Sequence, residues 1–312
     1  MKRRLIHAAN LLIAVGLATA VIVTSRPWEA WQFDGRFLAA LAASLVLNGF
    51  LVFVWAHRHA LVLSAAGADV APRELAWLVT FSNTANNLTP AASGEIARAW
   101  FLNRQFGVTY ERAGAAIVFE RVFMFGLMAL TALLAGLAAV GPSAPITAIA
   151  ALAVVSYIFV LPGLLAPLSR RFASEPSGGR IKRLLHGIFT GGLSVWSNRS
   201  VAAKTALWSA GSFTSMALIF YFAAAISGLQ LNAAETWALV GGATAVGVIS
   251  ALPFGLGAAE LSAIGIGELL GFDSQAVAAA FVLYRLFFTF PLALAGAAAY
   301  GKLTLTRLEE LA

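Results

Sequence analysis

Residues 87–125 read NLTPAASGEIARAWFLNRQFGVTYERAGAAIVFERVFMF, and residues 251–289 read ALPFGLGAAELSAIGIGELLGFDSQAVAAAFVLYRLFFT. Both stretches contain a proline and glycine break, then a turn that begins at a glycine, then an alanine-rich segment with one arginine near its middle. The matched pairs, at shifts of 163 or 164 residues, are Pro90 with Pro253, Gly94 with Gly257, Gly107 with Gly271, and Arg121 with Arg285. Internal repeats with interrupted apolar segments in corresponding positions are typical of secondary transporters, and they indicate the binding site.

The composition indicates an integral membrane protein. The 312-residue chain is 60% hydrophobic and 11% charged, and its mean hydropathy is +0.83, outside the range of soluble globular domains. Apolar runs of about 20 residues recur, as in transmembrane helices, whereas a membrane β-barrel would show short alternating segments. The chain contains no cysteine, which excludes disulfides and thiolate chemistry.

Six apolar stretches fit full membrane spans. They are Leu5–Ser25, Phe37–Ala56, Ala113–Val140, Ile146–Leu168, Val201–Ser227 and Ala276–Tyr300. The first follows basic residues as a signal peptide would, but it is longer than a signal core, so we expect it to be retained. Two further apolar stretches are interrupted: residues 75–97 by asparagines and a proline, and residues 236–266 by a proline and glycines.

Charge distribution predicts how the interrupted stretches enter the membrane. Cytoplasmic loops are enriched in Lys and Arg, which places the basic amino terminus in the cytoplasm. Arg98, Arg104 and Arg112 follow the first interrupted stretch, and they are cytoplasmic only if residues 75–97 leave and re-enter on the same side. The alternative, a kinked full span, would place these arginines outside. The second interrupted stretch lies in a region without Lys or Arg, which predicts that it starts and ends outside.

The predicted fold is therefore an all-α polytopic membrane protein with six full transmembrane helices and two re-entrant helical hairpins in an inverted-topology repeat. Residues 1–312 form one transmembrane domain. The first repeat, 1–140, contains a cytoplasmic-side hairpin at 75–97, and the second, 145–305, contains an outer-side hairpin at 236–266. We expect the bacterial cytoplasmic (inner) membrane as the location, with both termini cytoplasmic. Non-helical backbone at membrane depth must be buried or line a wet cavity, so both hairpin tips should meet polar partners.

Charged residues inside predicted spans are the strongest site candidates, because a charge at the bilayer centre costs about 2.5–3.5 kcal/mol on insertion scales. Arg121 and Arg285 are candidate phosphate ligands, since a guanidinium can hold two oxygens. Alternatively, each is half of a salt bridge that locks a helix to a hairpin. Glu120 and Arg121 are adjacent and point about 100° apart, which predicts different partners. Further candidates are Glu95, Arg98 and Glu260, which pair with those arginines, gate the site or meet a cationic headgroup.

The predicted hairpin tips carry residues that make turns or contact a ligand through their backbone. They are Asn86, Asn87, Pro90, Gly94, Pro253, Gly255 and Gly257. The four histidines lack metal-site spacing, so we expect no metal and no cofactor. The basic stretch from Arg170 to Arg183 predicts attraction to anionic lipids, not nucleic acid. Trp196 is predicted to lie in a loop or at the membrane interface.

The run PAASGEIARAWFLNR, the FER that follows in the next span, and the later PFGLGAAE and YR resemble the lysylphosphatidylglycerol synthase transmembrane-region family. The resemblance covers roughly residues 5–305 and implies a lipid-handling membrane domain. In the multiple peptide resistance factor, this region moves aminoacylated phosphatidylglycerol to the outer leaflet. Eleven residues follow Gly301, so we expect no aminoacyl-transferase domain after the last span. A lipid-modifying enzyme is accordingly a candidate partner.

The function predicted from these features is a lipid flippase, not an enzyme. It would move an anionic or aminoacylated phospholipid, or a lipid-linked carrier, between leaflets, with membrane lipids as partners. Two alternatives stay open: a scaffold or regulator of a lipid-modifying enzyme, and an intramembrane enzyme that modifies lipids. No Walker motif is present, so the chain itself supplies no ATP-driven step.

Overall fold

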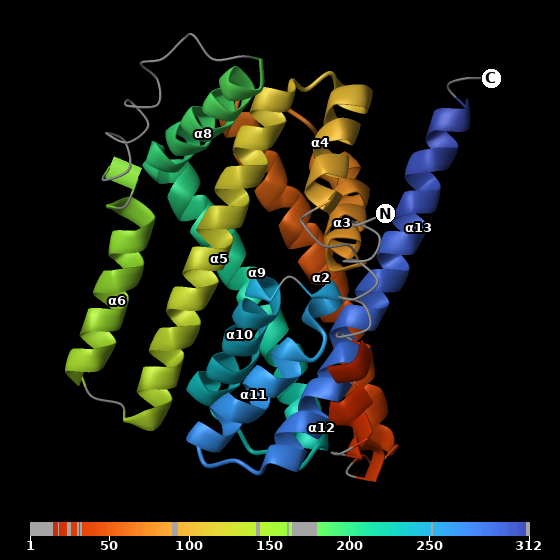
Figure 1. Cartoon of the computed structure of the whole chain (residues 1–312), viewed down its shortest axis with the longest axis vertical. Helices are drawn as coiled ribbons and strands as arrows, with labels where there is room; N and C mark the ends of the chain where they lie inside the picture. Colours follow the sequence, from red (N-terminus) through yellow and green to blue (C-terminus); the bar gives the residue numbers. More distant parts are fainter. Residues whose placement is uncertain are drawn as a thin grey trace.

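Helices make up nearly the whole of this computed structural model, which describes residues 15–17, 19–23, 26–29, 31, 33–88, 93–141, 144–160, 162–163, 180–250 and 252–309 and shows no strand among them (Figure 1). The elements are η1 (Pro27–Glu29), α2 (Gly35–Ala65), α3 (Pro72–Leu88), α4 (Ser93–Phe106), α5 (Tyr110–Val140), α6 (Ala144–Phe159), α8 (Arg180–Ser197), α9 (Arg199–Ile226), α10 (Ala233–Ile249), η2 (Pro253–Gly255), α11 (Ala258–Leu269), α12 (Ser274–Tyr284), η3 (Arg285–Thr289) and α13 (Phe290–Glu309).

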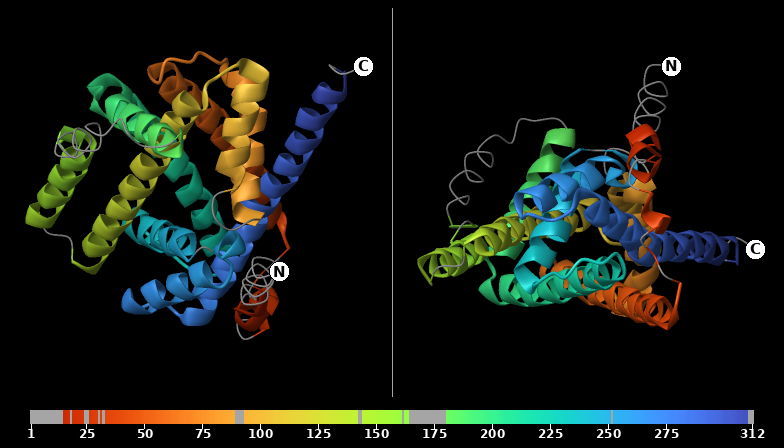
Figure 2. Two further views of the ribbon diagram at one scale, coloured as in Figure 1. Left: turned by 45° about the horizontal axis from the view of Figure 1, so that its top comes forward. Right: turned by 90° about the horizontal axis from the view of Figure 1, so that it is seen from below.

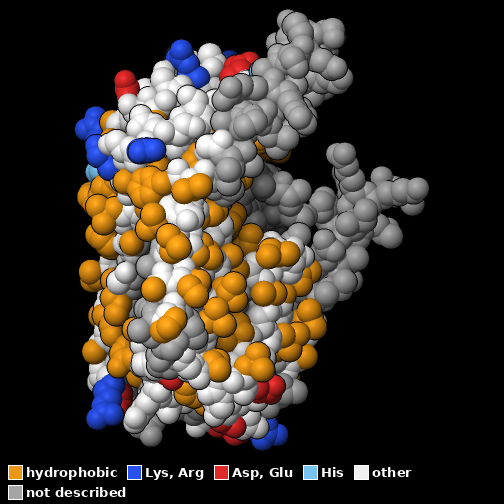
Figure 3. Space-filling view, turned by 90° about the vertical axis from the view of Figure 1, so that its left-hand side faces the viewer, with side chains coloured by type: hydrophobic (Ala, Val, Ile, Leu, Met, Phe, Trp, Pro, Cys, Tyr) orange, Lys and Arg blue, Asp and Glu red, His pale blue; other side chains and the backbone are white. Residues whose placement is uncertain are grey.

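Four helical segments of the described chain are long and apolar enough to cross a membrane: α2, α5, α9 and Ser274–Leu303. Each has at least 28 residues, or about 42 Å of helix, which exceeds a hydrocarbon core of about 30 Å. In Figure 3, hydrophobic side chains cover the middle of the visible face, and charged side chains lie toward its two ends. The protein is therefore an all-α membrane protein, as predicted.

The observed helices change the predicted span boundaries. The span predicted to end at Ala56 continues as α2 to Ala65. Of the predicted span Ile146–Leu168, the structure describes α6 and little after it, and much of Leu5–Ser25 lies outside the described residues. The count of six full spans therefore stays a prediction. Figures 1 and 2 both show α6 at the edge of the molecule beside α5.

The first interrupted stretch forms a helical hairpin of α3 and α4. The Nδ2 of Asn86 donates to Oε1 of Glu95 at 2.8 Å, and the Glu95 amide donates back to Oδ1 of Asn86 at 3.2 Å. A Cβ at Gly94 would overlap the carbonyl oxygen of Ser82, so glycine allows the two arms to touch. The second arm extends to Phe106, well past the predicted end at 97.

The second interrupted stretch forms a hairpin of α10 and α11 with the short turn η2 at its tip. Phe254 has φ 54° and ψ 10°, a left-handed conformation that is uncommon for residues other than glycine. Gly257 has φ 80°, and it precedes the first residue of α11. A Cβ at Gly255 would lie 2.8 Å from the Cα of Gly247, so this tip is also closely packed. The second arm runs to Leu269, slightly past the predicted end at 266.

The two hairpins open toward opposite ends of the molecule, and their tips meet near its mid-height (Figure 1), where α3 contacts η2. Each hairpin packs against the last long helix of the other half. Thr84 of α3 donates through Oγ1 to the carbonyl of Leu292 in α13 at 3.1 Å. Correspondingly, Nε1 of Trp237 in α10 donates to Oγ1 of Thr131 in α5 at 3.0 Å. These crossed contacts join the halves around a shared centre.

The last membrane helix contains one π turn, η3, between α12 and α13. The amide of Phe290 donates to the carbonyl of Arg285, a five-residue separation that defines the π geometry. The side chain of Asn48 in α2 donates to the carbonyl of Phe287 at 2.7 Å. The turn thus begins at the candidate arginine and is held by a neighbouring helix.

Helix α8 corrects the prediction made for Trp196. Trp196 was predicted to lie in a loop or at the membrane interface, but it belongs to α8, which packs along α5, and its side chain is buried in the protein. Its Nε1 donates to the carbonyl of Ile158 at 3.2 Å, and its ring lies 5.7 Å from the ring of Phe123. Gly191 and Gly192 lie against α5, which allows the close approach that buries the tryptophan.

Candidate functional site

Both hairpin tips and both repeat arginines line one cavity of about 620 Å³ at the centre of the fold. Asn86 and Asn87 come from the first hairpin and Phe254 from the second, while Arg121 and Arg285 come from the long helices. An adjoining space of about 170 Å³ shares several of these walls and extends toward a group of buried charged residues.

Glu120 is the centre of that buried charged group. Its Oε1 accepts from Nε of Arg58 at 2.8 Å, and its Oε2 lies 2.9 Å from Nδ1 of His59 and 3.4 Å from Nη1 of Arg98. All four side chains are buried. One carboxylate therefore joins α2 and α4 to α5 by charge-assisted contacts, which are stronger than neutral hydrogen bonds.

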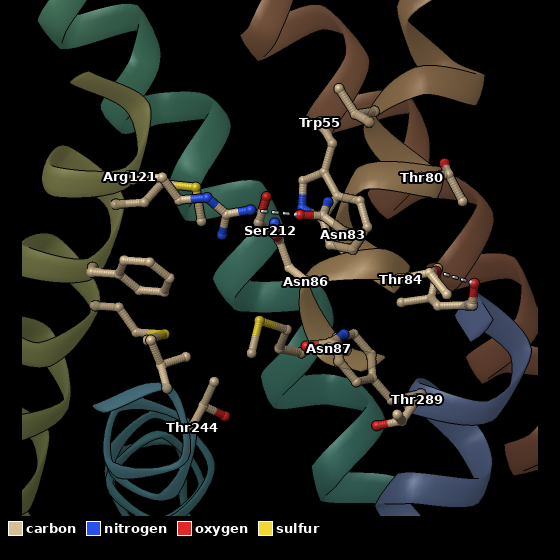
Figure 4. A pocket seen from close by; sticks show the side chains of 18 of the residues that line it. Trp55, Thr80, Asn83, Thr84, Asn86, Asn87, Arg121, Ser212, Thr244 and Thr289 are labelled. Atoms are coloured by element: carbon tan, nitrogen blue, oxygen red, sulfur yellow. Dashed lines mark hydrogen bonds between the residues drawn. The ribbon is translucent and has the colours of Figure 1, made fainter. Parts of the chain in front are cut away.

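Arg121 has different partners from Glu120, which confirms the prediction made from their adjacent positions. Its guanidinium forms an ion pair with Glu95 and donates to Oδ1 of Asn83 at 3.1 Å. Figure 4 shows Arg121 reaching from α5 toward Asn83 on α3, with Asn86 and Asn87 further along the same helix. The side chain keeps 29% of its surface exposed, so part of it remains accessible.

Arg285 makes the corresponding contact in the second half. Its Nε donates to Oε1 of Glu260 at 2.7 Å, and its Nη1 donates to the carbonyl of Phe254 at 2.7 Å. The other oxygen of Glu260 accepts from the amide of Gly257 at 2.7 Å. The arginine thus holds the strained tip of the second hairpin against the last membrane helix.

The structure brings the predicted site residues into two groups that share one cavity. Glu95, Arg98, Glu120 and Arg121 interact directly or through one another, and Glu260 with Arg285 forms the second group. The predicted tip residues that line the cavity are Asn86, Asn87 and Gly255. Pro253 is buried in η2, and Gly94 and Gly257 shape the hairpins. Pro90 lies outside the described residues.

Sequence reasoning missed Arg58, His59 and Asn83. The span predicted to end at Ala56 stops short of Arg58, and this boundary is wrong because α2 continues to Ala65 and Arg58 is buried. A signal was present: Arg58 continues the apolar helical stripe of Leu51, Val54 and Val62, all fully buried.

The charged group favours binding of an anion. Among the described residues it contains three arginines, Arg58, Arg98 and Arg121, beside two glutamates, Glu95 and Glu120. A phosphate accepts paired hydrogen bonds from a guanidinium as a carboxylate does, so it can replace a glutamate as the partner of an arginine. No group of three or more His, Cys, Asp or Glu side chains suited to a metal occurs in the described part of the chain.

The fold and cavity define a polytopic α-helical membrane domain with an internal polar site. The chain belongs to the lysylphosphatidylglycerol synthase TM region family, whose model matches residues 8–296. This match confirms the family resemblance drawn from the repeated motifs. No curated protein shows a significant match to the chain.

Proposed function

We propose that the protein moves a lipid between the two leaflets of the membrane, with an anionic or aminoacylated phospholipid, or a lipid-linked carrier, as cargo. The supporting observation is the single cavity lined by both hairpin tips and by Arg121 and Arg285. Each arginine is already paired with a glutamate on a hairpin, Glu95 or Glu260. A headgroup phosphate replaces one glutamate at a time as the partner of its arginine. Binding of the headgroup therefore releases the hairpin that carries this glutamate from its helix.

The proposed topology is six full spans and two re-entrant hairpins in an inverted repeat. The opposite directions of the hairpins and their crossed packing support it. The start of α5, which carries Arg112, and the last part of α13, which carries Lys302, lie toward one end of the molecule (Figure 1). Arg112 donates to the carbonyl of Gly67 at 2.8 Å, and Lys302 lies 4.4 Å from the ring of Trp77. By the positive-inside rule, we propose that this end faces the cytoplasm in a bacterial inner membrane. The basic residues near the amino terminus favour a cytoplasmic position for that terminus too, and six full spans then return the carboxyl terminus to the same side.

Cysteine labelling tests this orientation, because the chain has no cysteine of its own. Gln105 at the end of α4 and Gln275 at the start of α12 are both exposed. Gln105→Cys should react with a membrane-impermeant maleimide only from the cytoplasmic side, and Gln275→Cys only from outside. Labelling of both from one side would contradict the inverted topology, and labelling of both from outside would indicate that the first interrupted stretch is a kinked full span.

A leaflet assay tests transport. Purified protein is placed in liposomes of phosphatidylcholine that carry labelled phosphatidylglycerol, and the outer-leaflet fraction of the label is followed by a reducing agent or by chemical modification. We expect faster leaflet exchange than in protein-free liposomes, with the mass of the lipid unchanged. Failure to accelerate any of several anionic, aminoacylated and polyprenyl lipids contradicts the proposal, and a changed lipid mass favours the enzyme alternative.

A further inference from the structure

A groove of about 520 Å³ lies between α5, α9 and α10, separate from the central cavity. Its walls include Thr131, Ala217, Tyr221 and Trp237. Tyr221 is 43% exposed and Leu218 beside it is 40% exposed, so the groove opens to the side of the molecule. In a membrane this side faces lipid.

The groove offers few free polar groups to a ligand. Oγ1 of Thr131 donates to the carbonyl of Leu127 at 2.8 Å and accepts from Nε1 of Trp237 at 3.0 Å. Oγ1 of Thr236 donates to the carbonyl of Asn232 at 2.7 Å. These groups already have hydrogen-bond partners within the protein, so a water molecule in the groove would form few hydrogen bonds with them. A hydrocarbon chain in the groove would leave none of them without a partner.

Phe213 separates the groove from the charged space of about 170 Å³ that adjoins the central cavity, since it lines both. It stacks on Trp237, with ring centroids 5.0 Å apart. The chain has four methionines, and the three after Met1, at positions 124, 128 and 216, all line the charged space of the central cavity. Methionine is unbranched and adapts its shape, so this wall can yield to an apolar group.

Two helices connect the charged group to the groove. On α9, Ser212 contacts Nη1 of Arg58 at 3.4 Å. Ala210 and Thr214, on either side of Ser212 in the sequence, line the groove, so the groove runs beside the charged space along this helix. Along α5, the charged pair at 120 and 121 is followed by the methionines and then by the groove residue at 131. At 1.5 Å per residue, this path along α5 is about 16 Å long.

We propose that the groove holds a hydrocarbon chain of the same lipid whose headgroup occupies the charged cavity. The wall that moves aside as the hydrocarbon chain enters consists of Phe213, Met128 and Met216. The cargo is thus a lipid that keeps an acyl chain on the protein while its headgroup is bound, and not a free anion. This inference rests on the proposed lipid transport.

Photochemical labelling tests the link between headgroup and groove. The probe is phosphatidylglycerol with a diazirine near the middle of one acyl chain, compared with diacylglycerol that carries the same chain. The phospholipid should label residues 210–221 more heavily than the diacylglycerol does, and unlabelled phosphatidylglycerol should compete. Val46, which is 73% exposed on α2 at a similar depth, is the reference surface, and it should label equally with both probes. Equal labelling of the groove by both probes would overturn the inference.

Filling the groove gives a second test. Ala217→Trp occupies the groove, and Val46→Trp adds the same side chain to an exposed apolar surface elsewhere. For Ala217→Trp, we expect leaflet exchange of phosphatidylglycerol per folded molecule to fall several-fold, because the indole ring occupies the space that the acyl chain would enter. Val46→Trp should transport normally. If the wild type moves no lipid, the proposed function fails. If the wild type and a folded Ala217→Trp move lipid equally, only the groove assignment fails.

Discussion

In the first half of the molecule, the repeat arginine belongs to a network of six ionisable groups, whereas in the second half the arginine contacts one carboxylate and one carbonyl. Arg121 is linked through Glu95 to the buried group around Glu120, while Arg285 contacts only Glu260 and the carbonyl of Phe254 among the polar groups described. Matched positions in a repeat therefore differ in how firmly they are held. We infer that the second ion pair is the easier one to open.

The two supporting glutamates show how the same contact is built twice. Glu95 and Glu260 both lie in the first turn of the second hairpin arm, where the helix dipole favours a negative charge. Glu95 is one residue after Gly94, but Glu260 is three residues after Gly257. The two halves thus form the same glutamate–arginine contact although the glutamates lie at different distances from the matched glycines.

The largest effect is expected at Glu120, because the buried network around it is the main difference between the two halves. Glu120→Gln leaves Arg58 and Arg98 buried with one carboxylate fewer, and breaking a buried ion pair typically costs about 3–5 kcal/mol. We expect a marked fall in melting temperature or in the yield of monodisperse protein in detergent. A stability within about 1 kcal/mol of the wild type would show that the network is not what holds the first half together.

Substitutions of Arg121 and Arg285 test whether these arginines bind the cargo or only stabilise the fold. Arg121→Gln and Arg285→Gln should each lower lipid exchange per folded molecule by roughly ten- to a hundredfold, the worth of one charge-assisted contact of about 1.5–3 kcal/mol. Arg121→Gln should lose more thermal stability, because it belongs to the larger network. Lysine at either position should restore only part of the exchange. Near-normal exchange in both glutamine variants and in the double variant would mean that the arginines only lock the fold.

The hairpin tip should tolerate alanine less well than the turn that follows it. Gly257 and Gly271 have nearly the same positive φ, 80° and 83°, and alanine in the left-handed helical region costs about 1–2 kcal/mol. The ψ of Gly257 is −48°, which lies outside that region and is less favourable still for alanine. A Cβ at Gly257 would also overlap the side chain of Leu17, whereas a Cβ at Gly271 would meet open space. Thermal melting should therefore show a larger loss for Gly257→Ala than for Gly271→Ala. Equal losses would indicate that backbone conformation alone decides both.

The smallest effect is expected at Tyr284, which occupies in the second half the position of Glu120 in the first. Its hydroxyl is buried without a hydrogen-bond partner among the described residues. Tyr284→Phe should leave the melting temperature unchanged or raise stability by up to about 1 kcal/mol, because an unpaired buried polar group is removed. A clear loss of exchange at unchanged stability would instead assign the hydroxyl to the cargo.

The sequence predicted that the two interrupted stretches form helical hairpins and that the charged residues inside apolar segments pair with one another. Prolines, glycines and charges are rare inside such segments, so each one indicates a turn or a partner. That the hairpins are re-entrant and that these residues bind cargo stay predictions. The sequence did not predict that Arg58 and His59 are buried. A basic residue after an apolar run has the same sequence pattern whether it ends a span or pairs with Glu120, 62 residues away from Arg58. Helix α8 was missed for a related reason, since its burial of Trp196 depends on the surface of α5.

The π turn at Arg285–Thr289 determines the rotational phase of the last membrane helix. At its first residue, Arg285 must face Glu260, and after it in the chain, Gly296 must face Thr84 so closely that a Cβ there would overlap the threonine hydroxyl. In an uninterrupted α-helix of the same sequence, each residue advances by about 100°, so the second contact would turn away from α3 by about that angle. The wider turn absorbs one residue. The same membrane helix can therefore form the ion pair with Glu260 and the close contact with Thr84 of α3 at once.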